Sequence, residues 1–376
     1  MKYRNPFKPT AGKMPPVLVG RDKVINDFIE GLENGEGAPG RLMRITGPRG
    51  SGKTVLLSEL ASIASEQGWL VVNVSASGDL LESIRKKLLK VAALEPNTIR
   101  VGAGPVSIEA SRVKPDSEDF ETVFERKARE MTSRGKGLLV TMDEVQDASR
   151  NDVREIATAV QFLIREDQNI ALVFAGITTG VLDLLNGKAM TFLRRAKPEE
   201  LDAIPIDEVS DSLRTAVEDS GLSIEEEALA RAASATAGYA YLIQLVGYHI
   251  WRAAWLRCRE RSDGGIVISS VDAEKGIGEA MEEFKEAVLE TAIAGLPRTA
   301  VEFALAMSEA PARVVSTSDI AARLGKSTGY LSPYRRQLIA RQIIEQTAPG
   351  YVTFSIPFMG EFLAERRGEI LARYGG

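Results

Sequence analysis

The sequence predicts an α/β protein with a parallel sheet, followed by a helical region and a C-terminal helix-turn-helix unit. Three observations lead to this fold class. From residue 41 onward, short apolar runs alternate with amphipathic stretches; residues 207–290 are rich in alanine at helical spacing; and two capped helices near the C-terminus precede β-rich runs. The length of 376 residues is enough for more than one domain.

Composition is that of an ordinary globular chain. The 47 basic and 52 acidic residues give a net charge of -5, so the overall charge does not point to nucleic acid. His249 and Cys258 are the only residues of their types, so we expect no intrachain disulfide and no His/Cys zinc site, and we expect both to be structural. The N-terminus lacks the apolar core of a secretion signal, and no apolar run approaches the ~18 residues that span a bilayer. We therefore expect a cytoplasmic protein without membrane contact.

The predicted elements follow one another in a regular order. A proline-rich N-terminal arm leads into Gly20-Arg21-Asp22, and the first helix then runs to about Leu32. Glycine and proline between two β-rich runs predict a hairpin within residues 99–113, and a further strand is expected around Ile204. The remaining strands are expected at 42–46, 69–74, 137–142 and 170–175, interleaved with helices at 53–67, 79–93, 117–133 and 149–166.

These elements suggest three domains. The parallel-sheet core is expected over residues 1–206, a small helical domain over 207–296, and the helix-turn-helix unit over 297–376.

The segment from Gly47 to Thr54 fits the pattern G-x-x-x-x-G-K-[ST] and stands between a predicted strand and a predicted helix. Its glycines let the backbone close around anionic oxygens, and the following helix contributes its positive end. We expect Lys53 to contact the β- and γ-phosphates of ATP and Thr54 to ligate Mg²⁺. The core is thus predicted to be a P-loop NTPase, with nucleotide-binding residues Gly47, Pro48, Arg49, Gly50, Ser51, Gly52, Lys53 and Thr54.

An apolar strand that ends in two carboxylates supplies a second motif. Asp143 and Glu144 follow the run Leu138–Met142. We expect Asp143 to hold the metal and Glu144 to orient and polarise the attacking water. This pairing predicts hydrolysis rather than phosphoryl transfer to an acceptor.

With these two motifs as Walker A and Walker B, the sequence resembles the AAA+ ATPases over roughly residues 15–365. It is most similar to the origin-recognition-like and STAND-type members that carry a C-terminal winged helix. The run Val17–Asp22 resembles the box that precedes the first helix in those families, which implies that Gly20 and Arg21 lie near the adenine. The helical domain then corresponds to their lid.

The resemblance also implies residues that contact the γ-phosphate and so distinguish ATP from ADP. Thr178, with Thr179 as second choice, stands where a polar sensor 1 residue is expected, although a hydroxyl here also fits a simple helix cap. Arg194 and Arg195 lie where related ATPases place an arginine finger, which acts between subunits of a nucleotide-dependent homo-oligomer; the alternative is an exposed pair with weak surface contacts. No arginine occupies residues 234–244, where sensor 2 is usual, and Gly238-Tyr239-Ala240 resembles a "GxP" turn without its proline.

The C-terminal unit has helix-turn-helix spacing. Helices are expected at Ser318–Leu324 and Thr328–Ala340, with Gly325 as the turn and Pro333 near the first turn of the second helix, followed by a hairpin wing. From Pro297 onward, ten basic and seven acidic residues give a net +3, whereas the rest of the chain carries -8. The predicted contacts to double-stranded DNA are Lys326, Arg335, Arg336 and Arg341.

Taken together, the residues and the resemblance predict a Mg²⁺-dependent ATPase of AAA+ type that is associated with DNA and whose nucleotide state controls assembly or DNA binding. An alternative is a STAND-like signalling switch that uses the winged helix for protein contacts. The modest positive charge of the C-terminal unit leaves both open.

Overall fold

A computed structural model describes residues 3–10, 12–35, 37–76, 78–94, 118–187, 190–259 and 265–374. The predicted hairpin within 99–113 lies outside these residues. The chain forms two compact units. We call them the sheet unit, which comprises Lys23–Thr46 and Leu56–Glu200, and the helical unit, which comprises Met1–Asp22, Gly47–Val55 and Leu201–Gly376.

The sheet unit contains five parallel strands in the order β2-β3-β4-β1-β5. Every residue of the central strand β4 is buried, as expected for a parallel sheet that is covered on both faces. The α/β fold class is therefore confirmed, and the first four strands fall within a residue or so of the predicted ranges. The strands are β1 Leu42–Thr46, β2 Leu70–Ser75, β3 Leu138–Asp143, β4 Ile170–Gly176 and β5 Lys197–Glu200.

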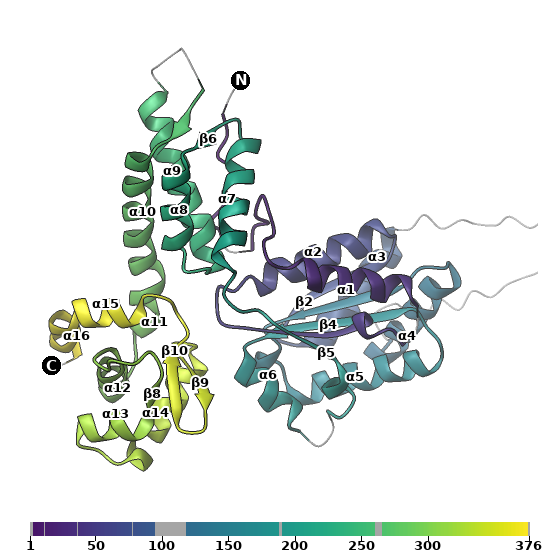
Figure 1. Cartoon of the computed structure of the whole chain (residues 1–376). Coiled ribbons are helices and arrows are strands. Elements are labelled where there is room, and N and C mark those ends of the chain that lie inside the picture. Colours follow the sequence, from purple (N-terminus) through teal and green to yellow (C-terminus); the bar gives the residue numbers. More distant parts are fainter. Residues whose placement is uncertain are drawn as a thin grey trace, which may run out of the picture. The chain divides into compact units, whose positions relative to one another are not determined.

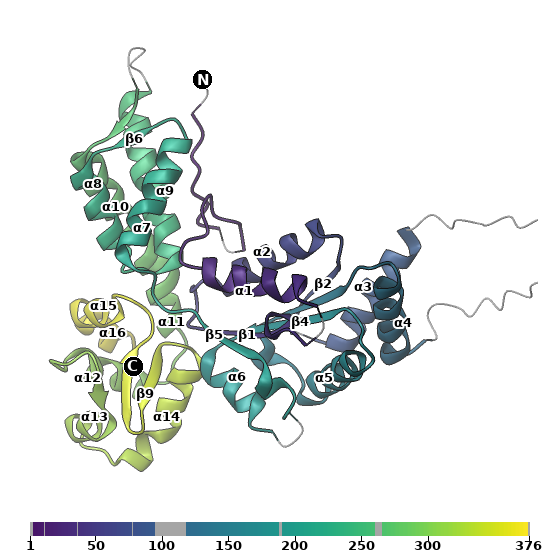
Figure 2. The same ribbon diagram turned by 45° about the vertical axis from the view of Figure 1, so that its right-hand side comes forward.

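Helices cover both faces of this sheet, with α2 on one face and α5 on the other (Figures 1 and 2). The apolar residues of α3, α4 and α5 pack with the buried side chains of β2, β3 and β4 in one core. Five helices agree with the predicted ranges to within a few residues: α1 Asp22–Glu33, α2 Lys53–Glu66, α3 Leu80–Leu94, α4 Phe120–Ser133 and α5 Arg150–Arg165. A further helix, α6 Thr178–Leu185, had no predicted range.

The prediction of the fifth strand was wrong. Ile204 lies outside any strand, and β5 is instead the charged segment Lys197–Glu200, paired with β1 at the edge of the sheet. An edge strand tolerates Pro198, which has no N–H to donate, and it leaves Glu200 exposed. Such a strand carries no apolar pattern by which a sequence search would find it.

The helical unit begins with a bundle whose longest members are α9 and α10. Two short strands, β6 and β7, pair in parallel; β6 lies between α7 and α8, and β7 lies between α9 and α10. This pair was not predicted. A π-helical segment, Lys285–Glu290, continues directly from α10. The elements are α7 Ile206–Asp219, β6 Ser223–Ile224, α8 Glu226–Ala235, α9 Ala240–Cys258, β7 Val267–Ile268, α10 Ser270–Phe284 and α11 Thr291–Ile293.

The C-terminal part of the helical unit has the predicted pair of helices, α13 and α14, joined at Gly325 in the left-handed conformation. The predicted hairpin is present as β9 and β10, and β8 adds a third, unpredicted strand beside β10. The elements are α12 Arg298–Ser308, β8 Val315–Ser316, α13 Thr317–Leu324, α14 Thr328–Ala340, β9 Ile344–Ala348, β10 Tyr351–Phe354, α15 Met359–Glu365 and α16 Arg367–Tyr374.

Pro333 corrects a detail of that prediction. It lies inside α14, beyond the first turn, where its ring nitrogen has no hydrogen to donate to the carbonyl of Gly329. The end of α14 that carries Gly329 is exposed, so water can satisfy this carbonyl.

Candidate functional site

The glycine-rich loop Gly47–Thr54 leaves the carboxyl end of β1 and enters α2. Gly50 and Gly52 adopt φ values of 76° and 92°, which side chains other than glycine rarely tolerate. The side chain of Lys53 is buried, and its Nζ donates to the carbonyl oxygens of Gly47 at 2.9 Å and Pro48 at 2.8 Å. The loop therefore curls around a buried ammonium group.

If this loop binds a phosphate chain, it should contain buried polar atoms that have no hydrogen-bond partner within the protein. The Oγ of Ser51 is buried and has no hydrogen-bond partner in the part of the chain that the structure describes. Buried hydroxyls are seldom left unpaired. Together with the buried ammonium of Lys53, this donor set suits a polyanionic oxygen ligand. Thr54, next in the loop, is exposed.

The predicted adenine-side residues contact this loop. Gly20 adopts φ 65°, and Arg21 as a whole is 8% exposed. Arg21 Nη2 donates to the carbonyl oxygen of Ser51 at 3.1 Å, and Nη1 donates to the carbonyl oxygen of Gly20 at 3.2 Å. Burial lowers the pKa of the Arg21 guanidinium, while Asp202 and Glu208 oppose the shift. Arg21 thus bonds to the backbone of the phosphate loop.

The two predicted carboxylates lie at the carboxyl end of β3. Asp143 is the last residue of the strand, and its Oδ1 accepts from the N–H of Glu144 at 2.9 Å. Glu144 has φ 52°, an uncommon conformation for a residue other than glycine. Strained backbone of this kind clusters at functional sites. The turn directs Glu144 out of the strand and toward Gln146, whose Nε2 donates to Glu144 Oε2 at 2.6 Å.

The same Gln146 reaches the neighbouring strand. Its Oε1 accepts from the N–H of Ile177 at 3.2 Å, directly after β4. Thr178 and Thr179 begin α6 at this point, and the Oγ1 of Thr178 lies 3.5 Å from a carboxylate oxygen of Glu200 at the end of β5. The structure therefore brings Glu144 and the predicted sensor threonines to one edge of the sheet.

The two predicted finger residues differ in their contacts. Both Arg194 and Arg195 are exposed in the 3₁₀ turn Leu193–Arg195. Arg194 donates to the carbonyl oxygens of Leu185 at 2.7 Å and Gly187 at 3.2 Å. Arg195 makes no side-chain hydrogen bond or ion pair with any described residue. Of the pair, Arg195 is the residue with fewer contacts within the described chain.

The predicted DNA contacts lie on or beside α14 and differ in their partners. Arg336 is exposed, and the Lys326 ammonium lies 5.5 Å from the ring centre of Tyr330. Arg341 is engaged within the chain, because its Nη1 donates to the carbonyl oxygen of Ala294 at 2.7 Å.

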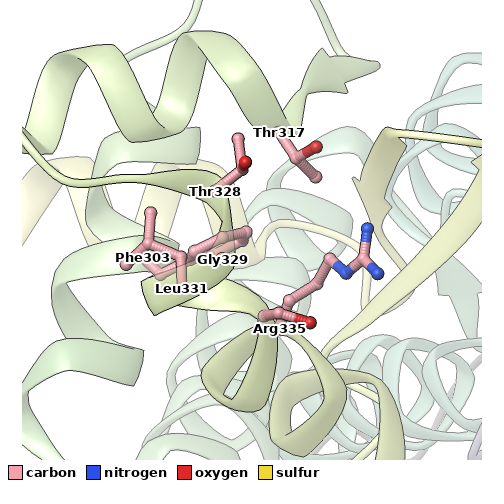
Figure 3. Close-up of a pocket in the computed structure, with 7 residues that line it drawn as sticks. Phe303, Thr317, Thr328, Gly329, Leu331 and Arg335 are labelled. Carbon is pink, nitrogen blue, oxygen red and sulfur yellow. The ribbon is translucent and has the colours of Figure 1, made fainter.

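Arg335 borders a cavity of about 270 Å³. Its Nε is buried without a hydrogen-bond partner among the described residues. Thr317 and Thr328 line the same cavity as Arg335 (Figure 3). A cation and hydroxyl groups around one cavity suit an anionic oxygen.

Sequence reasoning missed two residues of the site. Gln146 follows the acid pair by two positions, but a glutamine in a polar turn gives no signal of its own. Tyr239, which resembles the middle of a lid turn, donates its hydroxyl to the carbonyl oxygen of Arg49 in the phosphate loop at 2.6 Å. These two residues are 190 positions apart, so no local sequence pattern indicates their contact.

His249 and Cys258, both expected to be structural, lie on α9. The side chain of His249 is 10% exposed and lies between two carboxylates of α10, with Nδ1 3.1 Å from Glu279 and Nε2 2.9 Å from Glu283. Cys258 ends the helix with partial exposure. Within the described ranges, no three His, Cys, Asp or Glu side chains gather as a metal-binding cluster. No helix among the same residues is long and apolar enough to cross a bilayer.

The parallel sheet, the loop after β1 and the acidic end of β3 define a P-loop protein. Residues 17–174 match the sequence profile of the AAA ATPase domain, and residues 286–363 match that of a domain of unknown function (DUF8462). The chain thus carries an AAA+ P-loop ATPase domain. No protein of curated function matches the sequence.

Solved structures extend the likeness over almost the whole chain. The Aeropyrum pernix ORC2 protein, solved in ADPNP–ADP complexes, is similar with a TM-score of 0.62, 13% identity and coverage of 98% of each chain. A Walker-type ATPase of Pyrococcus abyssi has a TM-score of 0.64 and 15% identity, over 92% of this chain and 96% of that one. Cdc6p from Pyrobaculum aerophilum has a TM-score of 0.52 and 16% identity, over 97% of each chain. The chain therefore shares the fold of these proteins over almost its whole length.

Proposed function

We propose that this protein binds ATP with Mg²⁺ and hydrolyses it by direct attack of water. The observation that carries the proposal is the glycine-rich loop after β1, with its buried Lys53 ammonium and its unpaired Ser51 hydroxyl. The ammonium and the loop N–H groups are the donors that a triphosphate requires. When bound, Mg²⁺ would neutralise charge on the phosphate oxygens.

The remaining predicted residues supply the other roles. Thr54 and Asp143 would hold the metal, and Glu144 would orient the water and polarise it. The hydrogen bond from Gln146 keeps the Glu144 carboxylate in one orientation and ties it to the backbone before Thr178. Thr178 is our proposed sensor of the γ-phosphate. Arg195, the less engaged of the two arginines, is the candidate finger between subunits of a homo-oligomer.

Separate variants test the binding and the chemical step. Lys53→Ala should abolish measurable nucleotide binding, whereas Glu144→Gln should bind ATP normally and lose turnover by about 100-fold or more. Affinity is measured by calorimetry and turnover by phosphate release. Matched controls are Lys275→Ala and Glu274→Gln, which alter exposed residues of α10 and should change neither quantity. Normal turnover by Glu144→Gln would remove that carboxylate from the mechanism.

For the biological use of the ATPase, we propose DNA association, with nucleotide state controlling assembly or DNA binding. The support is the net positive charge of residues 297–376 and the unpaired guanidinium nitrogen of Arg335, which borders a cavity that Thr317 and Thr328 also line. We also propose that the three predicted domains, 1–206, 207–296 and 297–376, act as ATPase core, lid and winged helix.

One observation favours the signalling-switch alternative. The C-terminal part of the helical unit bonds to the end of the lid: Arg341 donates to the carbonyl oxygen of Ala294, and the hydroxyl of Tyr374 donates to that of Ile293 at 2.7 Å. Arg366 also pairs with Glu290. A winged helix that packs on the lid in this way suits a switch whose release exposes a protein-binding face. DNA binding by the intact chain separates the two proposals.

A further inference from the structure

Two side chains from outside the phosphate loop hold its backbone carbonyl groups. The Tyr239 hydroxyl donates to the carbonyl oxygen of Arg49 at 2.6 Å, and Nη2 of Arg21 donates to that of Ser51 at 3.1 Å. Tyr239 caps the start of α9, and Arg21 stands just before α1. The loop is therefore clamped at alternate residues by donors that belong to other segments of the helical unit.

A hydrogen bond that fixes a backbone carbonyl group also fixes the direction of the N–H group of the next residue, because the two belong to one planar peptide unit. The peptide bonds of the described chain are trans, and in a planar trans peptide the C=O of one residue and the N–H of the next point in opposite directions. When the Arg49 carbonyl faces Tyr239, the Gly50 N–H faces away from it. In the same way, the Gly52 N–H faces away from Arg21.

Both of these N–H groups are unused. Within the described ranges, neither the Gly50 nor the Gly52 amide donates a hydrogen bond to another residue. The two glycines have positive φ values, 76° and 92°, and positive φ is a feature of the backbone nests that bind anions. The two clamps thus fix the orientation of two unused donors.

Tyr239 is itself rigidly held. Its side chain is 8% exposed, and its ring meets Phe284 of α10 edge to face, with centroids 5.9 Å apart. A Cβ atom on Gly50 would overlap the tyrosine hydroxyl, so the ring lies directly against the loop. Burial raises the pKa of the Tyr239 hydroxyl to about 12, so the group stays protonated and remains a donor.

We infer that Tyr239 and Arg21 are positioning residues for the phosphate chain of the nucleotide: they hold the Gly50 and Gly52 amides toward the phosphates, and Tyr239 makes the lid part of phosphate recognition. The inference rests on the proposed nucleotide binding. Residues 234–244 contain no arginine, so in this stretch the lid acts on the loop backbone through a neutral hydroxyl. A loop that cradles the inner phosphates serves ATP and ADP alike.

The test removes one oxygen atom. Tyr239→Phe keeps the ring against Phe284 and loses only the hydrogen bond to Arg49. Loss of one hydrogen bond predicts that the Kd for ADP and for a non-hydrolysable ATP analogue both rise about 5-fold. In steady state KM should rise while kcat stays constant, because the loop binds ground and transition states equally. The control is Tyr241→Phe, whose hydroxyl bonds to no described residue and which should bind like the wild type.

Arg21→Lys provides a second, independent variant. It keeps the charge but loses the planar fork that reaches both Gly20 and Ser51, and it should weaken both nucleotides by a similar factor. Thermal unfolding of each variant checks that the fold is intact. If Tyr239→Phe and Arg21→Lys both bind the two ligands with wild-type affinity, the inference is wrong but the proposed function stands. A wild-type protein that binds neither ligand would overturn the proposed function, and the inference with it.

Discussion

Gln146 joins the carboxylate of Glu144 to the backbone at the end of the neighbouring strand β4. Its amide donates to Glu144 at 2.6 Å and accepts from the N–H of Ile177 at 3.2 Å. Gly176 and Gly180 make room for it, since a Cβ at either position would overlap the glutamine side chain. A single side chain thus links the proposed water-polarising group to the backbone that precedes the proposed sensor, Thr178.

This arrangement predicts that Gln146→Ala lowers kcat by about 10- to 100-fold with little change in nucleotide affinity, because a misoriented carboxylate no longer positions the water. Steady-state hydrolysis and equilibrium binding give the two quantities. Gln161→Ala, on the exposed side of α5, is the matched control and should behave like the wild type. Equal kcat values for the two variants would show that Gln146 does not orient Glu144.

The turn before Tyr239 predicts a large stability effect. Gly238 has φ 70°, its carbonyl oxygen accepts from the N–H of Ile204 at 2.9 Å, and an added Cβ would overlap the Ile204 backbone. We expect Gly238→Ala to reduce the free energy of unfolding by about 2–4 kcal/mol. Gly278→Ala, in α10 with open space around it, should instead stabilise the protein by about 1 kcal/mol. Chemical denaturation measures both, and similar midpoints for the two variants would contradict the turn's role.

Tyr239 also predicts a pH dependence at high pH. Burial raises the pKa of its hydroxyl from 10.0 to about 12, so the folded state keeps a proton that the unfolded chain releases. Below pH 10 this group adds no pH dependence, and between about pH 10 and 12 it costs the wild type up to about 2–3 kcal/mol. The unfolding free energies of wild type and Tyr239→Phe are compared over this range. The unfolding free energy of the wild type minus that of Tyr239→Phe should fall as the pH rises from 10 to 12. If this difference stays constant, the hydroxyl is not buried.

For the DNA proposal, Arg335 and Arg336 are replaced together by alanine. If both side chains neutralise phosphates, the affinity for duplex DNA should fall, and the slope of log affinity against log salt should shrink by about 0.9 for each phosphate that is no longer neutralised. ATP turnover without DNA should stay unchanged. The double variant Arg367→Ala and Arg373→Ala removes the same charge from α16 as a control. Unchanged affinity and slope in the first variant, or no binding by the intact protein at low salt, would favour the signalling switch.

The sequence predicted most of the elements that have a strong local signal. The strand before Gly47, the helix after Lys53 and the apolar run before Asp143 each combine periodicity with a motif, and the structure has them at the expected positions. β5 was missed because an edge strand with one partner needs no apolar alternation. Pro333 was expected near the first turn of its helix because its local cost is high, and it lies beyond that turn in a helix with the predicted bounds.

The site was predictable only in part, for a related reason. Lys53 and Glu144 belong to motifs in which chemistry fixes the spacing. Gln146 and Tyr239 act through single hydrogen bonds that depend on the folded path of other segments. A hydroxyl that meets a carbonyl 190 positions away can be found only once the turn at Gly238 is known.

The contacts of Lys53 bear on how tightly any nucleotide is held. Its ammonium already has two oxygen partners in the loop, Gly47 and Pro48, at 2.9 and 2.8 Å. An arriving phosphate therefore competes with the protein's own carbonyl dipoles, and binding exchanges one set of partners for another. The attraction that remains is the difference between a full anion and those dipoles. In return, the two carbonyl groups give the buried charge an internal counterpart and support the curvature of the loop.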